Sequence, residues 1–218
     1  MIDSYEALIS DYISKDDFFR FALEKTIYIP DEKVKQEWQK LKEMIHANKT
    51  VYMRGVKDTA GNHLFFDFYA KLFKNDQVKR DPSNTQNPAK IIETLTGYKK
   101  SKDLRNYQLS SIFGRSRNIF AFTAPWNIVY IPSMLDPLLS SEARGDLADE
   151  LQGKFMRHSY EKFKPYIDEF NKIITERHFL QSVDDHFEHL YNNNRMYPRE
   201  ATEKFEAIFR EDFTPITF

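Results

Sequence analysis

The chain has 218 residues, of which 41% are hydrophobic and 30% are charged, and its formal net charge is −1. This balance is typical of a globular protein that buries a core, and it excludes both a disordered chain and a histone-like nucleic-acid binder. Because the sequence contains no cysteine, it also excludes disulfides, thiolate zinc sites and a cysteine nucleophile. The sequence shows no membrane-spanning apolar run and no leader, so we expect a cytoplasmic protein without a membrane partner.

The first fifty residues are predicted to be helical. Apolar residues recur at helical spacing over residues 3–26, with a break expected around Ser14–Asp17. A second helix opens after Pro30 and continues to Asn48, with apolar side chains along one face. Residues 1–50 are therefore assigned to a helical N-terminal region.

A mixed segment follows this helical region. Residues 49–55 form a short strand candidate that ends at a glycine. Residues 62–73 fit either a strand or a helix, and we favour a helix from Phe66 onward. Residues 81–88 are turn-formers and predict a loop, after which Asn87 caps a helix with proline at its first position.

The middle of the chain contains two strand candidates, Tyr107–Phe113 and Ile119–Ile131. Residues 114–118 lie between them and are predicted to form a hairpin loop with Arg115 and Arg117 at its tip. Guanidinium groups match phosphate oxygens, so these two arginines are candidate nucleic-acid contacts, although ordinary solvent exposure explains them equally well. A second, weaker group of candidates lies in the polar connection before the first strand: Lys99, Lys100, Lys102 and Arg105.

The last third of the chain is predicted to be helical. Ser140 or Ser141 is a good helix N-cap, and the helical pattern continues to about Asn192 with a kink at Pro165. A final helix begins at Pro198. The fold class is therefore α+β and mostly helical, with a small β-hairpin-plus-helix module enclosed by helices.

Three regions follow from these elements, either as separate parts or as one compact domain: residues 1–50, 51–153 and 154–218. Charge also divides the middle region. Residues 79–118 contain nine basic and three acidic residues, for a net charge of +6, whereas residues 119–153 contain one basic and five acidic residues, for −4. A basic block beside an acidic one suits a phosphate-binding face next to a metal site, or a solvated surface whose charges pair within the fold.

Three phrases in residues 106–142 carry a family resemblance. The first contains Asn106, Tyr107, Gln108, Ser110, Ile112, Gly114 and Arg115; the second is Ala124–Ile128; and the third contains Asp136, Pro137 and Glu142. Together they resemble the His-Asn-His (HNH, ββα-metal) module of restriction-like endonucleases, over about residues 50–145. The resemblance implies a function in restriction or phage defence, with duplex DNA as the partner.

The resemblance also assigns roles to three positions. In such modules the first histidine deprotonates the attacking water, the asparagine holds that histidine and its loop, and the last histidine helps to bind a divalent ion. The asparagine role falls on Asn127, whereas Ser111 and Ser141 stand at the histidine positions. A serine hydroxyl is too weak a base at neutral pH, and serine has no ring nitrogen for a metal. We therefore predict a nucleic-acid-binding protein with impaired cleavage, for which no cofactor is certain and a divalent metal (magnesium or manganese) is expected only if it is active.

Two other functions remain open. The first is an active metal-dependent endonuclease in which Asp136 and Glu142, with Asp146 nearby, hold magnesium or manganese. The second is a protein-interaction or regulatory module without a nucleic-acid role, in which aromatic-rich terminal helices form a homo-oligomer interface.

Individual residues also have simpler explanations. Asn127 is equally explained as a turn asparagine that satisfies local backbone groups, and Trp126 is better explained as a core aromatic than as a base-stacking residue. The histidines at positions 178, 186 and 189 lack the spacing that binds one zinc ion best, so we interpret them as incidental.

Overall fold

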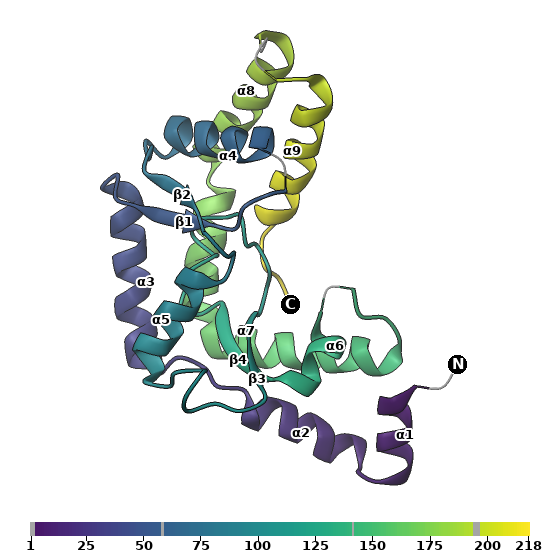
Figure 1. Cartoon of the computed structure of the whole chain (residues 1–218). Coiled ribbons are helices and arrows are strands. Elements are labelled where there is room, and N and C mark those ends of the chain that lie inside the picture. Colours follow the sequence, from purple (N-terminus) through teal and green to yellow (C-terminus); the bar gives the residue numbers. More distant parts are fainter. Residues whose placement is uncertain (1–2, 58, 141, 194–196) are drawn as a thin grey trace.

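The computed structural model describes residues 3–57, 59–140, 142–193 and 197–218. The fold is α+β and mostly helical, as predicted, with two small sheets among the helices (Figure 1). The helices are α1 (Ser4–Asp11), α2 (Lys15–Lys25), α3 (Asp31–His46), α4 (Thr59–Leu72), α5 (Gln86–Thr96), α6 (Asp136–Leu139), α7 (Asp146–Thr175), α8 (Arg177–Asn193) and α9 (Arg199–Asp212). The strands are β1 (Val51–Met53), β2 (Val78–Arg80), β3 (Tyr107–Ser111) and β4 (Ile128–Pro132), and a short 3-10 turn, η1 (Ser133–Leu135), follows β4.

Local capping explains the N-terminal helices. Asp3 Oδ1 accepts hydrogen bonds from two backbone N–H groups at the start of α1, and Ser14 Oγ accepts one from Asp17 N at the start of α2. The predicted break therefore exists, slightly earlier than expected, because α1 already ends at Asp11. α3 begins directly after Pro30, which confirms the second predicted helix.

β1 and β2 form a parallel pair, with Met53 opposite Arg80, and α4 connects them. The prediction that the helix in residues 62–73 begins at Phe66 was wrong, because α4 already begins at Thr59. Asn62, near the start of α4, exchanges two hydrogen bonds with the backbone of Val56, so its side chain joins this helix to the chain after β1. The predicted N-cap of α5 was also wrong, because Thr85 occupies that position.

β3 and β4 form an antiparallel pair, with Tyr107 opposite Pro132 and Ser111 opposite Ile128. The second predicted strand is much shorter than expected, because residues 119–127 fold into successive turns. The predicted hairpin loop at residues 114–118 is therefore wrong: the connection between the strands is residues 112–127. Buried side chains stabilise it, as described below, and they favour turns over an extended ladder.

The predicted long C-terminal helix is three helices, α6, α7 and α8. Ser140 lies at the C-terminal end of α6 and not at a helix N-cap, and Ser141 lies outside the described residues. α7 continues through Pro165 as one helix of 30 residues. α9 begins at Arg199 after Pro198, as predicted.

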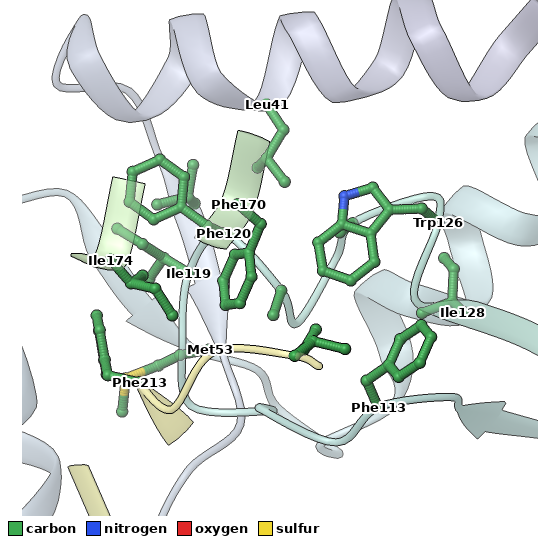
Figure 2. Packing of buried hydrophobic residues seen from close by; sticks show 14 of the residues in the cluster. Leu41, Met53, Phe113, Ile119, Phe120, Trp126, Ile128, Phe170, Ile174 and Phe213 are labelled. Atoms are coloured by element: carbon green, nitrogen blue, oxygen red, sulfur yellow. The ribbon is translucent and has the colours of Figure 1, made fainter. Parts of the chain in front are cut away.

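A single hydrophobic cluster contains residues from all three predicted regions. Trp38 of α3, Trp126 of the β3–β4 connection and Phe170 of α7 are fully buried in it, and the two indole rings meet edge to face with centroids 5.7 Å apart. Figure 2 shows Trp126 and Phe170 together with Phe120 and Phe113 in this core. Within the described residues, no helix combines the length and the apolar character needed to cross a bilayer.

Candidate nucleic-acid interface

Asn127 organises the connection between β3 and β4. Its side chain is buried, with 1% of its surface exposed, and Oδ1 accepts a hydrogen bond from Phe113 N at 2.9 Å. Nδ2 donates to Gly114 O at 2.9 Å and to Ala121 O at 3.0 Å. All three partners are backbone groups of the same connection, so Asn127 fixes its path between the two strands.

Ser111 is the last residue of β3 and pairs with Ile128, which directly follows Asn127. Its side chain is exposed, and Oγ donates to Gly114 O at 3.1 Å. Asn127 Nδ2 donates to the same carbonyl, so Gly114 O links the side chains of Ser111 and Asn127. The structure thus brings together two of the three predicted triad positions, while the third, Ser141, lies outside the described residues.

The predicted carboxylate metal ligands, Asp136 and Glu142, lie at α6 and directly after it. Asp136 is the first residue of α6 and is partly buried, and Glu142 is exposed in the turn after it. Groups of three or more histidine or carboxylate ligands suited to a metal are absent from the described part of the chain. Magnesium is commonly held by only one or two carboxylates with several waters, so the role of Asp136 and Glu142 as metal ligands stays a prediction.

Arg115 and Arg117 do not lie at an exposed tip, which corrects the sequence prediction. Arg115 Nε donates to Thr214 O at 3.2 Å and Nη1 to Phe113 O at 3.1 Å. Arg117 forms an ion pair with the buried Asp212, at 3.3 Å between Nη1 and Oδ2. Both side chains are partly buried against the C-terminal segment, so neither is a freely available phosphate ligand.

The environment of these arginines shifts two pKa values. Burial lowers the pKa of Arg115, against the opposite influence of Asp212 and Glu211. Burial raises the pKa of Asp212 to about 6, although Arg117 acts in the other direction through its charge and its hydrogen bonds. The loop and the end of α9 therefore share a largely buried charge pair, which is a structural contact.

The basic connection between α5 and β3 is exposed. Lys99, Lys100, Lys102 and Arg105 are all solvent-exposed and form no ion pair with a described residue. The two acidic residues near them accept backbone hydrogen bonds, Asp103 from Lys99 N and Glu93 from Lys100 N. These four cations are thus exposed, and their contact with phosphate stays a prediction.

A second basic group, at the ends of β1 and β2, was not predicted as a site. Arg54, Lys57, Lys79 and Arg80 are exposed and make no ion pair with any residue that the structure describes. Arg54 N donates to Ser116 O at 2.9 Å, so this group adjoins the β3–β4 connection. Lys79 and Arg80 belong to the basic block of residues 79–118, whereas Arg54 and Lys57 join it only through the pairing of β1 with β2.

Asp81, the acidic residue next to this basic group, has a structural role. Asp81 follows β2 and is fully buried, and its carboxylate accepts from the backbone N–H groups of Ser83, Gln86 and Asn87, and from Asn87 Nδ2. Burial raises its pKa, but these hydrogen bonds outweigh that effect and the net pKa is lowered. Asp81 therefore stabilises the start of α5 and forms no ion pair with the neighbouring arginines.

Other candidate positions have structural roles. Trp126 is a core residue, so a base-stacking role is excluded for it. His186 is buried against Phe68 and Phe187, and burial, with Lys71 and His189, lowers its pKa to about 4. A cavity of about 330 Å³ between α3, β1 and α5 is lined mainly by apolar side chains and includes none of the predicted triad residues.

Comparison with known proteins places the chain in a family. A family model described as "Uncharacterised protein PM1201" matches residues 29–218. The chain belongs to the PM1201 family. It is 37% identical over 202 residues to the protein "Uncharacterized protein PM1201" of Pasteurella multocida (strain Pm70), covering 90% of this chain and 91% of that protein. No solved structure matches the chain. The PM1201 family match includes both strand pairs and excludes α1 and α2.

Proposed function

We propose that this protein binds nucleic acid, with duplex DNA as its partner, through a fold of HNH-nuclease ancestry with impaired cleavage. Restriction or phage defence in the cytoplasm is the setting that the resemblance favours. The observation that carries the proposal is the contact of Ser111 and Asn127 with one carbonyl, Gly114 O. The asparagine position retains its loop-holding role, while the position of the general base holds a serine.

The chemistry of Ser111 supports loss of cutting. In an HNH module the group at the end of the first strand takes a proton from water, and this requires a base that is unprotonated near neutral pH. The Ser111 hydroxyl donates its hydrogen to Gly114 O and has no acidic or imidazole neighbour among its described partners. By rotating away from Gly114 O, this hydroxyl can donate its one hydrogen to a phosphate oxygen, but it cannot serve as the base.

The electrostatics of residues 79–118 support binding. Of the nine basic residues in this segment, Arg117 alone forms an ion pair with a described residue. The acidic residues of the segment accept backbone hydrogen bonds, so they leave the basic side chains unneutralised. Unpaired cations bind a polyanion by releasing its condensed counterions, and such binding weakens as salt is added.

Binding is tested by fluorescence anisotropy with a labelled duplex, titrated between about 50 mM and about 200 mM salt. We expect measurable affinity at low salt and a logarithmic decrease as salt rises. A protein that binds no duplex DNA at the lowest salt would contradict the proposal. Single-stranded DNA and duplex RNA, measured in parallel, identify the preferred nucleic acid.

Ancestry is tested by restoring the histidines. We expect no cleavage of plasmid DNA by the wild-type protein with magnesium or manganese, and cleavage by the double variant Ser111→His/Ser141→His. The matched control is Ser110→His/Ser140→His, which places histidines at the neighbouring serines. Efficient cleavage by the wild type would show that the site is not impaired, and a folded but inactive double variant would count against HNH ancestry.

The N-terminal helices favour a second candidate, a homo-oligomer interface. α1 contains no buried residue, and 80% of the Tyr12 surface is exposed directly after it. Ile13 and Phe21 are also among the exposed large hydrophobic residues. Analytical ultracentrifugation of the wild type and of Tyr12→Ser tests this role: a monomeric wild type excludes a stable oligomer.

A further inference from the structure

The parallel pairing of β1 and β2 brings two exposed arginines to one edge of the molecule. We propose that Arg54 and Arg80 form a clamp for the phosphodiester backbone next to the Ser111 loop, an inference that rests on the proposed nucleic-acid binding. In the register of the pair, Met53 lies opposite Arg80, so Arg54 directly follows the residue that Arg80 faces. The backbone positions of the two arginines are therefore neighbours, although α4 separates them in the sequence.

Backbone contacts connect this edge to Ser111. Arg54 N donates to Ser116 O at 2.9 Å, and Ser111 Oγ donates to Gly114 O at 3.1 Å. One short stretch of chain, residues 114–116, thus contacts both the arginine at the end of β1 and the serine at the end of β3. A phosphate group held at this edge would lie beside the exposed Ser111 hydroxyl.

The position of Arg80 depends on a glycine. A Cβ atom added at Gly55 would lie 2.7 Å from Arg80 Cγ. The Arg80 side chain therefore packs directly on the Gly55 backbone, and a larger residue at position 55 would displace it. Gly55 N donates to Asn84 Oδ1 at 2.8 Å, and Asn84 itself adopts a left-handed conformation with φ of 62°. These contacts hold the backbone beneath Arg80 and limit the orientations of its side chain.

The charges of this edge are available to a ligand. Asp81, which directly follows Arg80, is buried in the cap of α5, so it does not neutralise the clamp. Arg115 and Arg117, in contrast, are occupied by the C-terminal segment. Exposed lysines at positions 57 and 79 add positive charge on either side. Guanidinium forks from two neighbouring backbone positions suit the anionic oxygens of consecutive or opposed phosphates.

Recognition at this edge would be independent of base sequence. Arg54 directly follows β1 and Arg80 is the last residue of β2, so neither is on a helix that could enter the major groove. Contacts of this kind position the protein on the duplex and contribute most of its salt-dependent affinity. The expected ligand class is therefore the phosphodiester backbone of duplex DNA.

The test is duplex binding by Arg54→Gln, Arg80→Gln and the double variant, against Arg177→Gln as matched control. Arg177 is an exposed arginine at the start of α8, with no ion pair to a described residue. We expect roughly tenfold weaker binding for each single variant, on unrelated sequences alike, and a salt slope smaller by about 1 for each lost contact. The control should bind within about twofold of the wild type.

The outcomes separate this inference from the proposed function. If the wild type binds and the double variant binds equally well with an unchanged salt slope, the clamp is wrong and the proposed function stands. If the wild type does not bind duplex DNA at all, the proposed function itself fails. Circular dichroism melting of each variant establishes that a loss of affinity does not come from unfolding.

Discussion

Arg117 donates to Asp212 twice, from its backbone N at 3.2 Å and from guanidinium Nη1 at 3.3 Å, and both bonds reach the same oxygen, Oδ2. Asn118 Nδ2 adds a third contact, to Asp212 O at 3.2 Å. The end of α9 is therefore hydrogen-bonded to the β3–β4 connection, although Arg117 and Asp212 are 95 positions apart in the sequence. This contact explains why arginines predicted to bind phosphate are instead part of the folded structure.

The charge of Asp212 is expected to destabilise the folded protein above pH 6. Burial raises the pKa of Asp212 to about 6, from an ordinary value of 3.8. The folded state therefore binds this proton more tightly than the unfolded state does. The contribution of Asp212 to the free energy of unfolding decreases as the pH rises from about 4 to about 6, and remains low above that.

Asp212→Asn should remove this pH dependence. The amide oxygen can still accept hydrogen bonds from Arg117, and the carboxylate charge is no longer buried, while Arg117 keeps its own charge. We expect the free energy of unfolding to rise by on the order of 2 kcal/mol at pH 7.5 and to change little at pH 4. Urea unfolding at both pH values measures the difference. A variant less stable than the wild type at pH 7.5 would mean that the ion pair with Arg117 outweighs the burial of the carboxylate.

Part of this fold was predictable because its signals are local. Prolines at positions 30 and 198 mark the starts of α3 and α9, and Asn127 was identified both as the HNH asparagine and as a turn asparagine. Its observed contacts, all with backbone groups of one connection, agree with the second description and also with the loop-holding part of the first. The same hydrogen bonds of Asn127 therefore fit both descriptions.

What could not be predicted depends on contacts between distant segments. β1 and β2 are three residues each and lie on either side of α4, so no pattern within either strand indicates that they pair. The role that we propose for Arg54 and Arg80 follows only from that pairing. The extended pattern of residues 119–127 was misleading for a related reason: these aromatic and apolar residues are buried as turns in the core, where full burial removes the alternation that distinguishes a strand.

Asn127→Ala should strongly destabilise the protein. Its side chain satisfies Phe113 N, Gly114 O and Ala121 O in a buried region, and alanine would leave these groups without that partner. We expect the free energy of unfolding to fall by about 3 kcal/mol or more. Asn192→Ala, at an exposed position on α8, is the control and should change stability by less than about 0.5 kcal/mol. Similar urea midpoints for the two variants would refute the structural role of Asn127.

Asp81→Asn should weaken the start of α5. The carboxylate accepts four hydrogen bonds, and an amide that carries two hydrogens of its own cannot accept at both positions. We expect a loss of about 2 kcal/mol at pH 7. Because the folded-state pKa of Asp81 is lowered, its stabilising effect is present above the ordinary pKa and is lost as the pH falls through the lowered value.

The difference between Asp81→Asn and the wild type should therefore shrink as the pH falls below about 5, through the ordinary pKa of the carboxyl and towards its lowered folded-state value. Asp184→Asn, exposed on α8, provides the comparison for a carboxylate without such a cap. Equal losses at pH 7 and pH 3 would show that the Asp81 side chain contributes by its shape and not by its charge.

Gly55→Ala should separate the position of Arg80 from its charge. The added Cβ would meet the Arg80 side chain, which is flexible enough to move, so we expect a change of less than about 1 kcal/mol in the free energy of unfolding. Duplex affinity should nevertheless fall severalfold, because Arg80 keeps its charge but leaves its place beside Arg54. Gly153→Ala, where no atom lies within 4 Å of an added Cβ, is the matched control and should bind like the wild type. If Gly55→Ala also binds like the wild type, the orientation of Arg80 over the backbone has no part in binding.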